Sequence, residues 1–353
     1  MKVLRLTTLL DFGGQEKQFL SFTEKKELLQ NEYVFAAIGY GGNAEKVLES
    51  RGFDVRVLNL NYSIRNLSNI WKIYKLIKSI NPDIVHTAAA EANLQGIIAA
   101  KLAGVKVIIG EEIGISDHAS VARKIFKLVY KLADRVICVS KSVKTHLINM
   151  GEIDPPKGEV IYNPVSIPKE SNKISSDAFQ IIYVGRLEKV KNVDTLINAF
   201  SQIIKSNIHL TIVGDGRESE HLKKMAEILN PKNKITFVGF SDEPSIYLSN
   251  ADLFVLPSYS EGFGIAAVEA MFLKLPVLCS NVGGIPEFVY EDQNGWLFDP
   301  NDEKELVEKL NKIIEMDQDS LQKIGQNAYD TAKKFSVENY ITTLEQFYNT
   351  FHI

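Results

Sequence analysis

Two acidic residues and two glycines lie close together in the stretch SYSEGFGIAAVEAM, which runs from Ser258 to Met271. Glu269 stands within an almost wholly apolar run, and such a run predicts a buried helix. An unpaired carboxylate there would cost several kcal/mol, so a residue of this kind is normally paired or functional. Glu261 lies eight positions earlier, in a loop with Gly262 and Gly264. The pattern indicates a binding site in which a glycine-containing loop leads into a buried helix.

Two cations follow another strand-like segment. The stretch VGRLEKVKN places Arg186 and Lys191 five residues apart, directly after the strand-like QIIYVG. Two cations at the carboxyl end of a strand suit a diphosphate, although isolated surface charges would mean little. Near the N-terminus, DFGGQE follows a strand, so Gly13 and Gly14 could bring backbone N–H groups to an anion. A simple tight turn is the alternative interpretation of this glycine pair.

Several cofactor motifs are missing from the sequence. Neither IGYGGNAEKV nor LLDFGGQ has the G-x-G-x-x-G spacing of a dinucleotide site, and no G-x-x-x-x-G-K-[ST] stretch occurs. The six histidines show no spacing typical of a zinc site. The two cysteines, Cys138 and Cys279, each lie in an apolar run and are interpreted as buried core thiols. We therefore expect neither a bound dinucleotide cofactor nor a zinc ion.

The elements that must position these residues alternate between strands and helices. Apolar strands alternating with helices predict parallel sheets covered on both faces. The proline-rich stretch DPPKGEVIYNPVSIPKE interrupts the alternation and is typical of a linker. The sequence thus predicts two tandem, doubly wound, Rossmann-like α/β domains facing a cleft. The expected domains are residues 1–163 and 164–336, and the final helix at about 337–353 belongs to the second domain or packs back on the first.

Length and composition agree with a soluble two-domain protein. The chain has 353 residues, of which 45% are hydrophobic and 24% charged. Residues 1–163 hold 22 Lys and Arg against 17 Asp and Glu, whereas the remainder is acidic. A basic half can mark an anionic partner, although chance scatter of charges explains it equally well. No apolar stretch reaches about 18 residues and no signal peptide is recognisable, so we expect a cytoplasmic location.

The order of motifs resembles a known family. GGQE, VGRLEKVKN, FVGF, ADLFVLPSYSEGFGIAAVEAM, PVLCSNVGGIPEFV and NGWLFDPND follow one another along the chain. Together they resemble the retaining glycosyltransferases of family 4, which have the GT-B fold. The resemblance spans almost the whole chain, is highly specific within residues 181–300 and is looser before residue 140. Glu261 and Glu269 match the E-x7-E motif of that family.

The resemblance implies roles for the residues of the second domain. Glu269 would accept hydrogen bonds from the ribose of a nucleotide, and Glu261 would hold hydroxyls of the donor sugar. Arg186 and Lys191 match the pair that binds the diphosphate. The remaining residues assigned to the nucleotide-sugar are Gly14 in the first domain and, in the second, Phe240 and the helix-start residues Phe263, Gly264 and Ile265.

The resemblance also implies a reaction. A nucleoside diphosphate, with UDP the most common choice, would leave with its charge stabilised by the two cations and the helix N-terminus. No metal is required for this, and transfer would retain the anomeric configuration. The acceptor would be a saccharide or a lipid-linked saccharide of bacterial-type surface glycan synthesis.

The sequence departs from the family at two turns. Many members carry a histidine where Ile113 stands, so His118 is the expected replacement at the catalytic centre. The alternatives are that Glu112 takes the role, that the subgroup manages without it, or that His118 is a surface or capping histidine beside Asp117. His86 lies at the end of a strand where members often have histidine, and a core role is equally consistent with its position. Lys274 replaces the usual glycine before Pro276, so we expect that turn to have a different shape.

Two other functions fit the same pattern. A nucleotide-sugar epimerase would use the same fold without an acceptor, and a two-domain sugar-binding protein would perform no chemistry. The helices expected at 68–80 and 120–132 are basic and amphipathic, so weak association with an anionic membrane surface is also predicted. Apolar packing on the sheet with solvated lysines outside is the alternative for both helices.

Overall fold

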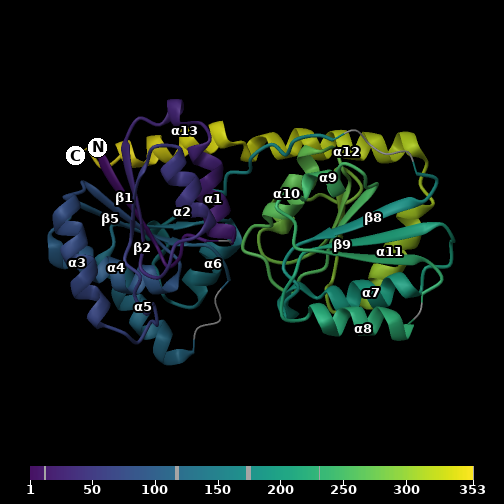
Figure 1. Ribbon diagram of the computed structural model, residues 1–353, viewed down its shortest axis with the longest axis horizontal. Helices are drawn as coiled ribbons and strands as arrows, with labels where there is room; N and C mark the ends of the chain where they lie inside the picture. Colours follow the sequence, from purple (N-terminus) through teal and green to yellow (C-terminus); the bar gives the residue numbers. More distant parts are fainter. Residues whose placement is uncertain (12, 116–118, 172–175, 230, 353) are drawn as a thin grey trace. The chain divides into compact units, whose positions relative to one another are not determined.

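The computed structural model contains two parallel sheets, one in each of two compact units (Figure 1). It describes residues 1–11, 13–115, 119–171, 176–229 and 231–352. Unit 1 comprises Met1–Ser166 together with Phe335–Ile353, and unit 2 comprises Ile167–Lys334. The predicted fold class of two doubly wound parallel-sheet domains is confirmed.

Unit 1 is built on a seven-stranded sheet in the order β3-β2-β1-β4-β5-β6-β7, with every neighbouring pair parallel. The strands are β1 (Lys2–Thr7), β2 (Glu32–Ala37), β3 (Asp54–Val57), β4 (Ile84–Ala88), β5 (Val107–Glu112), β6 (Arg135–Cys138) and β7 (Gly158–Val160). The helices are α1 (Gly14–Thr23), α2 (Asn43–Ser50), α3 (Ser68–Ile80), α4 (Ala90–Ala103), α5 (Ser120–Leu132), α6 (Lys141–Asn149) and α13 (Val337–Asn349), with 3-10 turns η1 (Lys26–Leu28) and η2 (Pro155–Lys157). All five residues of β4 are buried, as expected for a strand covered on both faces.

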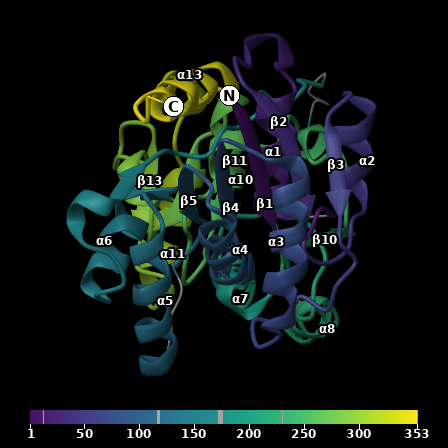
Figure 2. The same cartoon turned by 90° about the vertical axis from the view of Figure 1, so that its left-hand side faces the viewer.

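The helices of unit 1 form two layers. Because a crossover between parallel strands is right-handed, the helices that follow β3, β4 and β5 lie on one face, and those that follow β1 and β2 lie on the other. Helix α4 accordingly contacts both α3 and α5, whereas α1 contacts α2 and α13. Figure 2 shows the row of α3, α4 and α5 in unit 1.

The C-terminal helix α13 belongs to unit 1 and completes its core. Tyr340, Leu344 and Tyr348 are buried in a cluster that includes Phe22 and Phe35. Its start is capped by Ser336, whose side chain accepts from the backbone N–H of Asn339. The buried Glu345 accepts a 2.8 Å hydrogen bond from the Tyr33 hydroxyl. A helix far along the chain is therefore held to the first sheet by both apolar packing and a buried polar contact.

A buried polar network crosses the middle of the unit 1 sheet. The Arg5 guanidinium lies 2.8 Å from a Glu111 oxygen, and the His86 ring nitrogen Nε2 lies 3.1 Å from the same oxygen. His86 Nδ1 in turn lies 2.7 Å from the Tyr348 hydroxyl of α13. Burial, with a contribution from the Arg5 charge, lowers the pKa of His86 to about 4. His86 is therefore a neutral core histidine that connects β4 to α13, which corresponds to the structural alternative of the sequence prediction.

Unit 2 is built on a six-stranded parallel sheet in the order β10-β9-β8-β11-β12-β13. The strands are β8 (Phe179–Val184), β9 (Ile208–Val213), β10 (Lys234–Gly239), β11 (Leu253–Leu256), β12 (Val277–Ser280) and β13 (Gly295–Phe298). The helices are α7 (Val193–Ser201), α8 (Ser219–Leu229), α9 (Ser245–Leu248), α10 (Ile265–Phe272), α11 (Glu303–Ile314) and α12 (Gln318–Ala332), with 3-10 turns η3 (Lys189–Lys191), η4 (Ile285–Glu287) and η5 (Lys333–Phe335).

The strand order of unit 2 reverses direction next to β8. From β8 the chain moves outward to β9 and β10, then returns to place β11 on the other side of β8. The carboxyl ends of β8 and β11 therefore flank a topological switch point, which is where open α/β sheets bind ligands.

The turn after α10 contradicts the expectation raised by Lys274. We expected lysine at this position to change the turn, but Lys274 itself adopts the left-handed conformation, with φ 57°. Its Nζ lies 5.5 Å from the centre of the Tyr329 ring on α12. A cation over an aromatic face contributes roughly 0.5–1 kcal/mol at exposed sites, which offsets part of the backbone strain. The packing of α12 thus retains a glycine-like turn without glycine.

The pKa of His86 predicts acid sensitivity in unit 1. The folded protein binds a proton on His86 only near pH 4, whereas the unfolded chain binds it near the ordinary value of 6.5. The free energy of unfolding should therefore fall as pH drops from about 6.5 to 4, by up to about 3 kcal/mol from this residue. Urea titrations read by hydrogen exchange in β4 and β5 would measure the change for unit 1 alone.

The control for this prediction is His86→Gln, which removes the titrating group. This variant should show a smaller loss of stability between pH 7 and pH 4.5 than the parent, whatever its stability at pH 7. Equal pH dependence in the two proteins would contradict the role assigned to His86.

Candidate active site

The candidate site lies at the carboxyl edge of the unit 2 sheet, in the loops that follow β8 and β11. The backbone N–H of Tyr259 donates a 2.8 Å hydrogen bond to the Val190 carbonyl, which joins the two loops. Asn192 is fully buried in a left-handed conformation, with φ 55°. Its side-chain amide donates to the carbonyls of Pro257 and Pro300, at 3.0 and 3.1 Å. These bonds hold the segments that carry the candidate residues in a defined arrangement.

The centre of the site is an ion pair between the two loops. Lys191 Nζ lies 2.6 Å from Glu261 Oε1, and the two side chains are 17% and 11% exposed. The buried Ser258 donates a 2.8 Å hydrogen bond to the same Glu261 oxygen. Since both charges are largely withdrawn from water, their mutual attraction is stronger than that of a surface pair. The sequence predicted both residues as part of one site, and the structure brings them into direct contact.

The second predicted cation is more open. The Arg186 side chain is exposed, and it makes no ion pair with any of the residues that the structure describes. Its backbone carbonyl accepts a 2.9 Å hydrogen bond from the Tyr183 hydroxyl, which fixes the start of the loop. Burial, followed by the charge of Glu261, raises the pKa of Tyr183 well above its ordinary value. Tyr183 is therefore a neutral structural group, whereas the Arg186 guanidinium is available to an anionic ligand.

Gly264 and Gly283, in and beside the Glu261 loop, have backbone conformations and neighbours that leave no room for a side chain. Gly264, which caps the N-terminus of α10, has φ 104°, and a Cβ there would lie 2.4 Å from Ile285. Gly283, after β12, has φ 56°, and a Cβ there would lie 1.7 Å from the Glu261 carbonyl oxygen. Phe263 is 2% exposed and packs on Phe288 with ring centres 5.4 Å apart. The Glu261 loop is thus anchored by the packing of Phe263 on Phe288 and approaches the backbone at Gly283 too closely for a side chain there.

Helix α10 is buried on most, but not all, of its surface. Ala267, Val268, Ala270, Met271 and Phe272 are buried. Glu269 is only half-buried, and it shares a partly open stripe with Ile265 and Ala266 because residues four apart lie on the same face. The prediction of a buried Glu269 therefore holds for its Oε2 atom, which is buried, but not for the residue as a whole, which is partly exposed.

Three more predicted site residues come from other segments of the chain. Phe240 follows β10 at the same edge of the sheet and is 60% exposed. Gly14 is the first residue of α1 and belongs to unit 1, where no atom lies within 4 Å of the position of a Cβ. His118, the expected replacement for the family histidine, lies outside the described residues. The alternative, Glu112, is 3% exposed and accepts a 3.0 Å hydrogen bond from Asn93 inside unit 1.

Four residues of the site were not singled out from the sequence. Ser258, Tyr183, Asn192 and Gly283 set the positions of Glu261, Arg186 and the loop backbones through the contacts above. Ser258 stands three residues before Glu261 and could have been recognised as a partner within one turn of chain. Tyr183 likewise contacts a residue three positions away, whereas Asn192 and Gly283 act through contacts distant in sequence, which one sequence does not reveal.

Both cysteines are core residues, as predicted. Cys138 and Cys279 are buried and free. Burial is the main cause that raises the pKa of both thiols, and the charge of the nearby Glu261 adds to it for Cys279. Neither thiol has the exposed, electropositive surroundings of a reactive cysteine.

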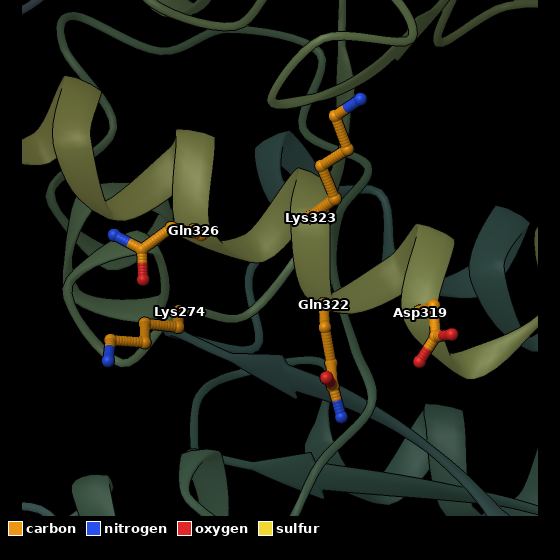
Figure 3. Close-up of a pocket in the computed structure, with 5 residues that line it drawn as sticks. All are labelled: Lys274, Asp319, Gln322, Lys323 and Gln326. Atoms are coloured by element: carbon orange, nitrogen blue, oxygen red, sulfur yellow. The ribbon is translucent and has the colours of Figure 1, made fainter.

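A hollow of about 490 Å³ lies at the opposite end of α10 from the glycine loop (Figure 3). It is lined by Lys274, Asp319, Gln322, Lys323 and Gln326. Since an α-helix rises about 1.5 Å per residue, the eight residues of α10 separate it from the candidate site by roughly 12 Å. Its lining consists of long, flexible side chains of α12 and one turn, and it contains none of the predicted site residues.

Two parallel-sheet units, with cation-bearing loops at the switch point of unit 2, agree with the GT-B fold of glycosyltransferases. Residues 166–331 match the model of Glycosyl transferases group 1, and residues 12–168 match that of Glycosyltransferase Family 4. The two models together span residues 12–331. With a relative that is 31% identical over 75% of the chain, they show that the chain belongs to the glycosyltransferases.

Curated relatives and solved structures agree with this assignment. The chain is 31% identical to UDP-Gal:alpha-D-GlcNAc-diphosphoundecaprenol alpha-1,3-galactosyltransferase of Escherichia coli, over 75% of each protein. It is 28% identical to a Campylobacter jejuni N-acetylgalactosamine-N,N'-diacetylbacillosaminyl-diphospho-undecaprenol 4-alpha-N-acetylgalactosaminyltransferase, over 62% of this chain and 60% of that protein. The fold matches Anabaena Alr3699/HepE, solved with UDP and with UDP-glucose, with a TM-score of 0.86 for the UDP complex, 23% identity and coverage of 99% and 100%.

The close approach at Gly283 predicts a specific defect. Gly283→Ala forces a Cβ against the Glu261 carbonyl, so the loop must shift. The affinity for UDP, as the candidate ligand of this site, should then fall about tenfold or more, which corresponds to roughly 1.4 kcal/mol of binding. Calorimetry with UDP measures the effect. Gly104→Ala is the matched control, because Gly104 has φ 73° but no atom within 4 Å of a Cβ. Unchanged UDP affinity in Gly283→Ala would show that the loop position is unimportant for binding.

Proposed function

We propose that this glycosyltransferase moves a hexosyl or N-acetylhexosaminyl group from a UDP-sugar to a saccharide acceptor, most fittingly a lipid-linked one, in surface-glycan synthesis. The observation that carries the proposal is the Lys191–Glu261 pair beside the exposed Arg186, at the switch point of the unit 2 sheet. The names of the Escherichia coli and Campylobacter jejuni relatives support a diphosphoundecaprenol-linked acceptor. The UDP and UDP-glucose complexes of HepE support the choice of nucleotide.

Each site residue receives a role in this proposal. Arg186 and Lys191 bind the diphosphate, and the N–H groups of Phe263, Gly264 and Ile265 at the start of α10 face its oxygens. Glu269 accepts hydrogen bonds from the ribose hydroxyls. Its half-buried position suits this role, because it is open on one side only.

The ion pair gives Glu261 and Lys191 a joint role. Glu261 neutralises Lys191 and holds it in place, with Nζ 2.6 Å from Oε1. When the donor binds, the diphosphate offers Lys191 a second anion, and the Glu261 carboxylate can accept hydrogen bonds from sugar hydroxyls. As the glycosidic bond breaks, negative charge grows on the diphosphate, so the cations stabilise the transition state more than the ground state.

Two further features belong to the proposal. Transfer retains the anomeric configuration, with the acceptor attacking the face from which UDP leaves. The enzyme acts at the cytoplasmic surface of a membrane as a peripheral protein. None of the helices in the described ranges is both long and apolar enough to cross a bilayer.

The proposal predicts an acceptor-dependent and metal-independent reaction. UDP release from a panel of UDP-hexoses and UDP-N-acetylhexosamines should require a GlcNAc- or GalNAc-diphospholipid and should persist in EDTA. Arg186→Ala and Lys191→Ala should each lower kcat by roughly a hundredfold or more, as loss of a charge-stabilising group does. NMR of the product should show the same anomeric configuration as the donor. UDP-sugar conversion without any acceptor would indicate an epimerase instead, and loss of activity in EDTA would contradict the metal-free assignment.

The two glutamates should separate nucleotide binding from transfer. Glu269→Ala removes the acceptor of ribose hydrogen bonds, so UDP affinity should fall about ten- to hundredfold, since each such bond contributes roughly 1.5–3 kcal/mol. Glu261→Ala releases Lys191 for the diphosphate, so UDP affinity should be equal or higher while transfer falls by about two orders of magnitude or more. Calorimetry with UDP and a UDP-release assay measure the split. Parental UDP affinity in Glu269→Ala would refute the ribose assignment.

A further inference from the structure

Two tyrosines form an exposed aromatic pair at the carboxyl edge of the unit 1 sheet. Tyr40 follows β2 and Tyr62 follows the neighbouring strand β3. Tyr40 is 48% exposed and Tyr62 is half-buried, and their ring centres lie 6.2 Å apart with the ring planes at 64°. In such an edge-to-face pair the rings do not cover each other by stacking. The tyrosine pair therefore presents aromatic surface at the edge where α/β sheets bind ligands.

The turn that carries Tyr40 is fixed by the neighbouring β1–α1 connection. The backbone N–H of Leu10 donates a 3.1 Å hydrogen bond to the Tyr40 carbonyl. Asp11 accepts a 3.1 Å hydrogen bond from the backbone N–H of Asn43, the first residue of α2. The backbone on both sides of the turn is thus held, and the exposed Tyr40 ring projects from a defined position.

The loop that carries Tyr62 is held by two buried side-chain amides. Asn69 of α3 donates a 2.9 Å hydrogen bond to the Asn61 carbonyl, and Gln95 of α4 donates a 3.0 Å hydrogen bond to the Ser63 carbonyl. Asn69 and Gln95 are 1% and 0% exposed, and the Asn69 amide also donates to Gln95 at 3.2 Å. The core of unit 1 therefore fixes the residues directly before and after Tyr62. A binding group that is held in place beforehand loses less conformational entropy when its ligand arrives.

A glycine leaves room for the Tyr62 ring. A Cβ at Gly39 would lie 2.7 Å from Tyr62 Cδ1, 2.6 Å from Leu9 and 3.1 Å from the Thr8 carbonyl oxygen, so the ring packs directly against the end of β2. The Thr8 hydroxyl donates a 3.2 Å hydrogen bond to Oε2 of Glu91, in the first turn of α4. Glu91 is only partly buried. The same edge therefore carries aromatic rings and a positioned carboxylate.

We infer that the tyrosine pair binds the acceptor sugar, stacking on the C–H face of an N-acetylhexosamine ring while Glu91 accepts hydrogen bonds from its hydroxyls. A pyranose carries C–H groups on its faces and hydroxyls around its rim, so it is complementary to an aromatic surface beside a carboxylate. Aromatic side chains with a small number of placed polar groups are the usual lining of a small-molecule site. The inference rests on the proposed function, which supplies the acceptor.

A second aromatic pair in unit 1 does not have this arrangement. Trp71 and Tyr74 of α3 are stacked, with ring centres 4.8 Å apart and planes at 8°, so each covers one face of the other. The Lys75 ammonium also lies 5.6 Å from the centre of the Trp71 ring. Trp71 is 58% exposed and is therefore a matched control for the removal of an exposed aromatic side chain.

Sugar binding without a donor is the first test. Saturation-transfer NMR on the whole protein, with methyl α-N-acetylglucosaminide and methyl α-N-acetylgalactosaminide as probes, should show saturation of ring C–H protons for at least one of them. Tyr40→Ala and Tyr62→Ala should each weaken this binding about fivefold, as loss of one aromatic contact does. Tyr40→Phe and Tyr62→Phe keep the ring faces and should bind the probe like the parent, as should Trp71→Ala.

Acceptor kinetics are the second test. With a water-soluble, short-chain N-acetylhexosaminyl diphosphate as acceptor, both alanine variants should raise the acceptor KM about fivefold and leave kcat near the parental value, because the contact is present before and during transfer. UDP affinity, measured by calorimetry, should be parental in every variant. The lipid-free acceptor ensures that contact with a membrane does not contribute to the effect.

Several outcomes would overturn the inference. These are the absence of saturation transfer in the parent, a parental acceptor KM in both alanine variants, and an equal loss in Trp71→Ala. A fall in UDP affinity in the tyrosine variants would assign the pair to the nucleotide instead. If the phenylalanine variants lost binding as the alanine variants do, the hydroxyl and not the ring face would be the binding group, and stacking would be excluded.

Failure of this inference can be told apart from failure of the proposed function. Sugar binding that depends on Tyr40 and Tyr62, in a protein that turns over no UDP-sugar, would leave the saccharide site standing and remove the transfer proposal. Transfer with an acceptor KM that is insensitive to both tyrosines would do the reverse.

Discussion

The Lys191–Glu261 ion pair connects the two loops that flank the switch point of the unit 2 sheet. Each partner comes from the carboxyl end of a different central strand, so the pair forms only when β8 and β11 lie side by side. The surrounding contacts serve its geometry: Asn192 anchors one loop, Ser258 orients the carboxylate and Gly283 leaves room for the backbone beneath it. Burying two charges costs free energy unless the geometry of the pair is good. The hydrogen bonds of Asn192 and Ser258 and the space at Gly283 hold Lys191 and Glu261 in such a geometry.

Unit 1 relies on a different kind of buried polar contact. The Arg5, Glu111 and His86 side chains lie within the sheet, and Tyr348 connects them to the last helix. Apolar packing alone would accept several placements of α13, because hydrophobic contact is not directional. Hydrogen bonds from Tyr348 and to Glu345 have defined geometry and so select one placement. The network is structural, and its residues are too deeply buried to meet a substrate.

The two units divide the proposed work between them. Unit 2 presents cations and backbone N–H groups at a switch point, which suits a nucleotide diphosphate. Unit 1 exposes Ile125, Leu128 and several lysines along α5, which suits the membrane location proposed for the enzyme. For a transferase whose acceptor is anchored in a membrane, separate surfaces for donor and lipid are physically reasonable, because the donor site needs water-soluble, charged ligands and the lipid surface does not.

The sequence by itself determined the fold class, because strand and helix periodicities, glycine turns and the proline-rich linker are local patterns. It also determined the glycosyltransferase family and predicted Arg186, Lys191 and Glu261 as parts of one site. The roles of these three residues stay predictions. Tertiary structure alone decided the Lys191–Glu261 contact, the left-handed turn at Lys274 and the one-sided opening at Glu269. It also decided which apolar stripe of α5 is covered. These features depend on residues distant in sequence that meet only when the sheets assemble, and local spacing contains no information about such partners.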